Sequence, residues 1–185
     1  MENFTDKTSE VIKASFDKAE EMANSQVHPL HLVSILWDDP SASTSTDIKP
    51  TLLKGIIERV GGNITQFNRA LLSRLNKLPI VHPTPTPPIP LTNSYHAVLR
   101  EAQKLQKDQG DQFVAVDHLL LAIIHVDHTE MKDLLKASGT DGKALEAELK
   151  RKRGGRKVDS RGAESQFEAL TKCQSSHLRS AQYHR

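Results

Sequence analysis

Apolar residues recur every three or four positions through most of the chain, which is the spacing of one face of an α-helix. The first face joins Ile12, Phe16, Ala19 and Ala23, and Thr5 stands ahead of it as a candidate N-cap. Pro29, Pro50 and Asn63 mark the starts of three further helices. Their apolar positions are Leu32, Ile35 and Leu36, then Leu53, Ile56 and Ile57, then Ile64, Phe67, Leu71, Leu75 and Leu78.

This order of helices occurs twice in the sequence. LHLVSIL at 30–36 matches DHLLLAI at 117–123, so that His118 aligns with His31 at an offset of 87 residues. The register holds from Phe4 to Leu36 without a gap, and it makes Thr92 a second cap. The later half matches at an offset of 78 residues, since Gly139 aligns with Gly61. The second repeat is therefore nine residues shorter than the first. We assign the extra residues of the first repeat to the polar stretch SASTSTDIK after Pro40, because polar surface loops tolerate insertion.

Two units are fewer than an open solenoid needs, so we expect them to pack face to face. The predicted fold is all-α, with eight helices arranged as two pseudo-twofold four-helix repeats in one globule. The double-repeat domain covers 1–152, with repeat one at 4–78 and repeat two at 91–152. Six prolines make 79–90 a stiff, extended linker, although such a segment can also be a ligand for an aromatic groove. Residues 153–185 are expected to form a linker and a disordered or partly helical tail.

Composition narrows the class of protein. The 185 residues are 37% hydrophobic and 26% charged, which supports one core with some polar chain left over. The net charge of +2 is too small to imply a nucleic-acid or membrane partner by its sign. The single cysteine, Cys173, fits a reducing compartment. The start MENFTDKTSE is not a secretory signal, and no apolar stretch is long enough to span a membrane, so we expect a cytoplasmic location, with a nuclear location as the alternative.

Catalytic motifs are not found in the sequence. The Gly142-Lys143 pair has Ala137 and Ala144 where a phosphate-binding loop needs a glycine and a hydroxyl. Cys173 lies in a polar tail without groups that would lower its pKa. We therefore predict a protein that is not an enzyme and needs no cofactor.

The duplicated motifs point to a known family. The pattern FT…VI…A, the segment HPLHLV, the GG break and GDQFVAVDHLLLAI resemble the Clp amino-terminal repeat domain of ClpB-type and heat-shock protein disaggregases. The resemblance covers about residues 4–172, and KRGGRKVDSRGAESQFEALTK is similar to the family's linker into its first ATPase module. It implies a domain that recruits unfolded or aggregated proteins, here without the ATPase modules.

The resemblance also implies positions for substrate contacts. Thr5, Asp111 and Asp117 match a polar, substrate-linked surface patch, and Leu99 and Leu105 match a hydrophobic groove between the repeats. A purely structural role is compatible with the patch, because Thr5 and Asp117 are well placed as helix caps and Asp111 lies in a turn. The expected partners are unfolded or aggregated protein segments. The alternative partner is a full-length Clp-type ATPase for which the chain is a regulator or adaptor.

Two other hypotheses rest on charged residues and histidines. A basic cluster could contact phosphates or act as a nuclear address, but it has no stacking aromatics and is also typical of a solvated helix end. Its members are Lys150, Arg151, Lys152, Arg153, Arg156 and Lys157. The pairs His28/His31 and His125/His128 have the spacing of metal ligands. Structural zinc normally needs four ligands, so helix packing or hydrogen bonding is favoured and no metal is predicted.

Overall fold

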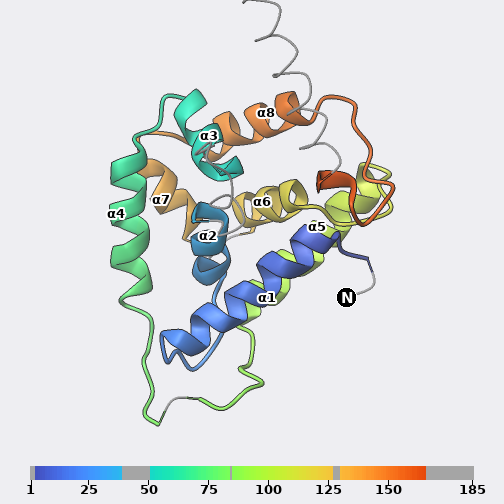
Figure 1. The fold of residues 1–185 in the computed structure, drawn as a ribbon. Helices are drawn as coiled ribbons and strands as arrows, with labels where there is room; N and C mark the ends of the chain where they lie inside the picture. The colour runs from blue at the N-terminus through green and yellow to red at the C-terminus, as the bar shows by residue number, and fades with distance from the viewer. Residues whose placement is uncertain (1–2, 39–50, 84, 127–129, 166–185) are drawn as a thin grey trace, which may run out of the picture.

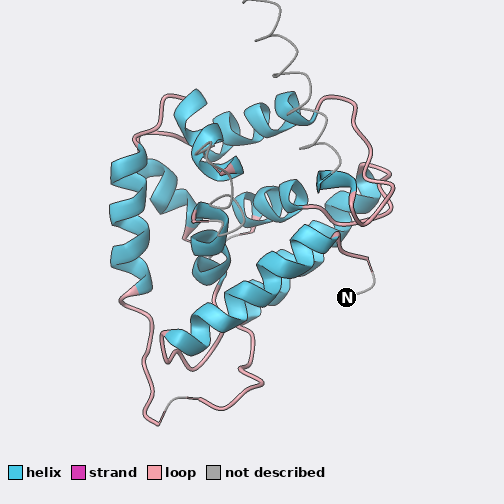
Figure 2. Cartoon of the chain, in the orientation of Figure 1, coloured by secondary structure: helices cyan, strands magenta, loops and turns pink. Residues whose placement is uncertain are grey.

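The computed structural model describes residues 3–38, 51–83, 85–126 and 130–165. The predicted loop insertion after Pro40 and the terminal tail with Cys173 lie outside the described residues. The described part of the chain is helical, with three isolated β-bridges and no strand (Figure 2). None of its helices is long and apolar enough to cross a membrane.

Eight helices form two sets of four, as the repeat predicts (Figure 1). The first set is α1 (Asp6–Glu21), α2 (Pro29–Trp37), α3 (Leu52–Arg59) and α4 (Ile64–Leu75). The second set is α5 (Asn93–Asp108), α6 (Val116–His125), α7 (Met131–Ala137) and α8 (Gly142–Arg153). Helix α5 begins and ends 87 residues after α1, and α8 begins and ends 78 residues after α4, which are the two offsets found in the sequence. Residues 163–165 form a further helical turn.

Helix ends follow the predicted caps in most places. The side chains of Thr5, Asn63, Thr92 and Asp141 each accept a hydrogen bond from a backbone amide in the first turn of the following helix. Ala23 was expected on the first helix, but α1 ends at Glu21 and Ala23 turns the chain with a φ of +51°. The repeat places Gly110 at this position in the second unit, with a φ of +67°.

Two symmetry-related bridges tie the repeats together. Phe4 pairs with Val114, and Leu91 pairs with Val27 at the equivalent positions of the opposite repeats. The Thr5 amide donates to the Val114 carbonyl oxygen at 3.0 Å, and the Thr92 amide donates to the Val27 carbonyl oxygen at 3.1 Å. Each repeat therefore begins on the loop that precedes the second helix of the other repeat, which is the predicted pseudo-twofold relation.

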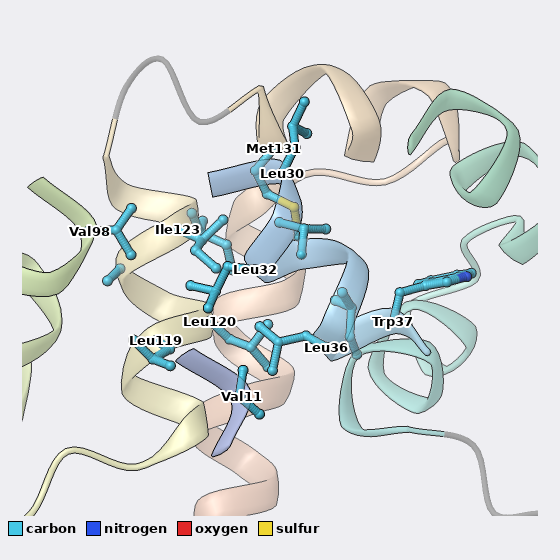
Figure 3. Close-up of a cluster of buried hydrophobic side chains, with 14 of the residues drawn as sticks. Val11, Leu30, Leu32, Leu36, Trp37, Val98, Leu119, Leu120, Ile123 and Met131 are labelled. Atoms are coloured by element: carbon cyan, nitrogen blue, oxygen red, sulfur yellow. The ribbon is translucent and has the colours of Figure 1, made fainter. Parts of the chain in front are cut away.

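The core lies on α2 and α6, which are buried on nearly every side (Figure 3). Leu30, Leu32, Leu120 and Ile123 are at most 1% exposed, and Trp37 stacks on Phe67 with 4.6 Å between ring centroids. Because these helices are apolar on most faces, they carry little polar surface of their own. The polar groups of the candidate site therefore lie at helix ends.

A buried histidine opens each central helix. His31 Nδ1 accepts from the His28 amide at 2.9 Å, and His118 Nδ1 accepts from the Ala115 amide at 2.9 Å. The opposite ring nitrogen of His31 lies 2.9 Å from Asn24 Oδ1, so it carries the proton and donates. Burial, with nearby positive charge, lowers the pKa of His31 to about 4. These contacts confirm hydrogen bonding as the role of His31, and the described residues contain no group of three or more potential metal ligands.

The free energy of unfolding should decrease as the pH is lowered, because of the shifted pKa of His31. The unfolded chain takes up a proton near the ordinary histidine pKa of about 6.5, whereas the folded chain resists protonation until about pH 4. The stabilisation is therefore complete above pH 6.5 and is lost as the pH falls towards 4. We expect urea midpoints to decrease over this range, with a shallower decrease in His31→Gln.

His31→Gln should also cost about 1–3 kcal/mol at pH 7, because it disturbs a buried hydrogen-bonded group. His96→Gln is the matched control, since His96 is exposed on α5. Identical pH slopes for His31→Gln and the parent chain would contradict the assignment.

Candidate functional site

Thr5, Asp111 and Asp117 lie together at one end of the molecule, although they are far apart in the sequence. Thr5 is the N-cap of α1, Asp111 follows α5, and Asp117 is in the first turn of α6. The Phe4–Val114 bridge brings the start of α1 to the loop between α5 and α6. The sequence suggested that Asp117 is a helix cap, but it does not hold that position. Ala115 holds that position, and the His118 ring accepts its amide hydrogen.

The two aspartates belong to a buried ionic cluster with His118 and Arg153. Arg153, the last residue of α8, donates to the Asp111 carboxylate and, at 2.8 Å, to Asp117 Oδ2. Because His118 Nδ1 is an acceptor, Nε2 carries the proton and donates to Asp111 Oδ2 at 3.0 Å. Burial lowers the pKa of His118, which favours this neutral form.

The positions in repeat one that are equivalent to this cluster are occupied by uncharged residues. The offsets pair Asn24 with Asp111, His31 with His118 and Leu75 with Arg153. Asn24 Oδ1 accepts from His31, its amide nitrogen donates to the Pro79 carbonyl oxygen at 3.0 Å, and Leu75 is buried. The second repeat therefore holds an ionic version of a neutral packing arrangement.

Residues 154–165, which we call the strap, fold back over this end of the molecule. The Val158 carbonyl oxygen accepts from the Gln112 and Phe113 amides at 3.0 and 3.3 Å, and the Val158 amide donates to Asp111 Oδ1 at 3.0 Å. Val158 and Ala163 are buried against Ala115. Figure 1 shows the orange-to-red segment after α8 returning to the start of α1. The sequence assigned 153–185 to a linker and tail, and the described part of that region packs on repeat two.

Glu164 belongs to this cluster of contacts and was not indicated by the sequence. Its Oε2 accepts from the Thr5 hydroxyl at 2.5 Å, and its Oε1 accepts from the Val116 amide at 2.9 Å. Burial raises the pKa of Glu164 despite these two hydrogen bonds. No local pattern marks this residue, because its burial depends on contacts with segments about 50 and 160 positions away.

The strap and the ionic cluster cover most of the predicted polar patch. Thr5 is fully buried, and Asp111 is 6% exposed. Asp117 remains partly exposed, and its carboxylate is paired with Arg153. In this conformation the patch faces the chain's own residues.

Leu99 and Leu105 lie on α5 and are only partly buried against the core. Leu99 is the counterpart of Ile12, which is 3% exposed, and Leu105 is the counterpart of the half-exposed Lys18. Repeat two therefore keeps apolar side chains at surface positions where repeat one has a fully buried residue or a lysine. The polar patch lies beyond the C-terminal end of the same helix, since Asp111 follows α5 by three residues.

The basic cluster engages the chain itself. Lys150 pairs with Glu146 at 2.7 Å, Arg151 pairs with Glu148 at 2.7 Å, and Lys157 donates to the Gln109 carbonyl oxygen. Arg156 donates to the Arg153 carbonyl oxygen at 2.8 Å. A cavity of about 330 Å³ is lined by Lys150, Arg153, Arg156 and Lys157 together with Leu121 and Leu149. These contacts favour the helix-end interpretation over a phosphate-binding surface.

Repeat one supplies a test of the ionic cluster. Arg153→Leu leaves Asp111 buried without its cation and should cost about 3–5 kcal/mol in unfolding free energy. Adding Asp111→Asn recreates the neutral Asn–His–Leu arrangement and should recover at least half of that loss. Guanidinium unfolding followed by circular dichroism measures both.

Arg151→Leu is the matched control, because Arg151 lies two residues earlier on α8 and is 64% exposed. Its effect should be about 0–1 kcal/mol. A double variant no more stable than Arg153→Leu alone would show that Asp111 and Arg153 are not coupled.

Comparison with known proteins agrees with this architecture. The family model described as "Clp repeat (R) N-terminal domain" matches residues 3–138. Heat shock protein 104 of Schizosaccharomyces pombe is 34% identical over 169 residues, which cover 91% of this chain and 18% of that protein. The chaperone protein ClpB of Rhodopseudomonas palustris is 30% identical over 93% of this chain and 18% of its own length. The chain thus spans less than a fifth of the length of these relatives.

Solved structures show the same fold. The Hsp104 N-terminal domain from Candida albicans has a TM-score of 0.74 and 29% identity, with 87% of this chain and 98% of that chain covered. The N-terminal domain of ClpD from Arabidopsis thaliana, at 21% identity, has a TM-score of 0.60 over 83% of this chain and 96% of its own. With two helical repeats in the predicted register and a family match over most of its length, the chain belongs to the Clp repeat N-terminal domain family.

Proposed function

We propose that this chain is a protein-binding module that recognises exposed apolar segments of unfolded or aggregated proteins. Membership of a family that supplies the N-terminal regions of chaperone proteins supports a role in protein binding. The observation that carries the proposal is the pair Leu99 and Leu105, which keep apolar surface on α5 at positions where the other repeat does not.

The proposed site is an apolar seam along α5. A client segment would bury apolar side chains against Leu99 and Leu105, with each large side chain worth about 1.5–3 kcal/mol when fully buried. Two or three such contacts, less the cost of ordering the client, correspond to dissociation constants of roughly micromolar to millimolar. Weak binding suits a module that engages and releases many clients.

A Clp-type ATPase is the proposed source of mechanical work for these clients. The sequence Gly142-Lys143 opens α8, with Ala137 and Ala144 at the positions where a phosphate-binding loop requires a glycine and a hydroxyl. Binding of clients and their remodelling are therefore assigned to different parts of a chaperone system.

Removal of the seam should weaken client binding without loss of the fold. We expect Leu99→Ser/Leu105→Ser to lower the affinity for a fluorescently labelled, unstructured apolar peptide at least tenfold, which corresponds to about 1.4 kcal/mol. Fluorescence anisotropy at two salt concentrations measures this change. Little dependence on salt would separate apolar binding from phosphate-type contacts through the basic cluster.

Leu72→Ser/Ile80→Ser is the matched control, because these side chains are 49% and 59% exposed and belong to repeat one and the segment after it. It removes more exposed apolar surface than the seam variant and should still leave the affinity unchanged. Equal losses in the two double variants, with unchanged helical circular dichroism, would refute the seam.

A further inference from the structure

The strap is held by the three kinds of contact that proteins use to bind peptides. Its backbone pairs with residues 112 and 113 through the Val158 carbonyl oxygen. Its aliphatic side chains, Val158 and Ala163, are buried against Ala115. Its Glu164 carboxylate sits at the start of α6, on the Val116 amide and the Thr5 hydroxyl. A carboxylate at a helix N-terminus is also favoured by the helix dipole.

The pseudo-symmetric counterpart of this carboxylate site, at the start of α2, lacks the same donors. The residue equivalent to Val116 is Pro29, which has no amide hydrogen. The equivalent of Thr5 is Thr92, whose hydroxyl lies 3.2 Å from the Val27 carbonyl oxygen and donates to it. The pseudo-symmetry of the fold therefore does not create the site. The site exists at the start of α6, and not at the start of α2, because of two local differences.

The hydrogen bonds of Glu164 are partly offset by the free energy needed to bury its carboxylate. Burial raises the pKa of this carboxyl group, and the Asp117 charge raises it further, so the docked state loses part of what its two hydrogen bonds provide. The strap also buries only two small aliphatic side chains. The free energy of strap docking is thus the sum of small favourable contacts and an unfavourable burial of charge.

We propose that the strap is an intramolecular occupant of a peptide site that the second repeat forms with Thr5, and that it exchanges with segments of partner proteins that have the same chemistry. The partner segment is extended and carries an aliphatic residue followed six residues later by a carboxylate, as Val158 and Glu164 do. This rests on the proposed function, because it describes how access to the patch of Thr5, Asp111 and Asp117 is controlled in a protein-binding module.

The strap itself is the probe for the test. A labelled peptide of residues 154–166 is titrated against the full chain and against full-length variants whose own strap is weakened. A tethered segment acts at an effective concentration of about 1 mM, so the intact strap should exclude the peptide from the parent chain. Val158→Asp places a charge in the buried aliphatic position, and Glu164→Lys reverses the charge at the helix N-terminus. Both chains should bind the peptide, with dissociation constants on the order of 0.1 mM.

Matched peptides carry the same changes. A peptide with Val158→Asp or Glu164→Lys should bind every chain at least tenfold more weakly than the unmodified peptide. Glu164→Lys is also the safeguard if Val158→Asp destabilises the domain, because Glu164 belongs to neither cluster of buried apolar side chains. Thermal unfolding followed by circular dichroism shows that the variants are folded.

The inference is overturned if the folded variants bind the unmodified peptide no better than the changed peptides. It is equally overturned if the parent chain binds the peptide as tightly as the variants do, because the strap then does not occupy the site. The apolar client of the seam separates this result from the proposed function. Loss of strap-peptide binding with an intact Leu99/Leu105 effect removes only the inference, whereas the opposite result removes the seam and keeps the site.

Discussion

The reciprocal bridges between the two repeats are the constraint on which the rest of the structure depends. Because the Thr5 amide bonds to Val114 and the Thr92 amide bonds to Val27, each repeat begins at the entrance to the other repeat's buried helix. This crossing buries α2 and α6 from both sides and leaves their N-termini as the places where polar groups can enter. It also brings a threonine hydroxyl next to the first amide of α6, where Glu164 binds.

The scaffold is symmetric, but its chemistry is not. Equivalent positions hold Asn24 and Asp111, Leu75 and Arg153, Pro29 and Val116, and Ile12 and Leu99. In every pair the residue of repeat one is neutral and packs internally, whereas that of repeat two adds a charge, a hydrogen-bond donor or partly exposed apolar surface. At these four positions repeat one is limited to internal packing, whereas repeat two carries the groups from which the ionic cluster, the carboxylate site and the proposed seam are built.

The sequence was sufficient for the fold because helical periodicity and capping are local signals. Thr5 and Asn63 could be identified at helix starts from their neighbours alone, and the offsets of 87 and 78 residues located the two halves of the repeat. Asp117 was misplaced because α6 begins at Val116, so Ala115 is the N-cap and Asp117 lies inside the first turn, where its Oδ1 accepts from the His118 amide at 2.9 Å. The strap escaped prediction for a different reason. Val158, Ala163 and Glu164 are isolated in a polar segment, and only tertiary contacts bury them.

The ionic cluster and the strap are physically connected. Buried charge pairs are often no more stabilising than apolar residues of similar volume, and Leu75 shows that an apolar residue fits this position. Arg153 instead fixes the position of the end of α8, because its two carboxylate partners hold it beside the loop that follows α5. The chain turns immediately afterwards at Gly154, whose φ is +56°, and then meets Asp111 again through the Val158 amide. Asp111 therefore binds both the end of the helix and the strap that leaves it, which explains why a charged residue is useful where repeat one needs only an asparagine.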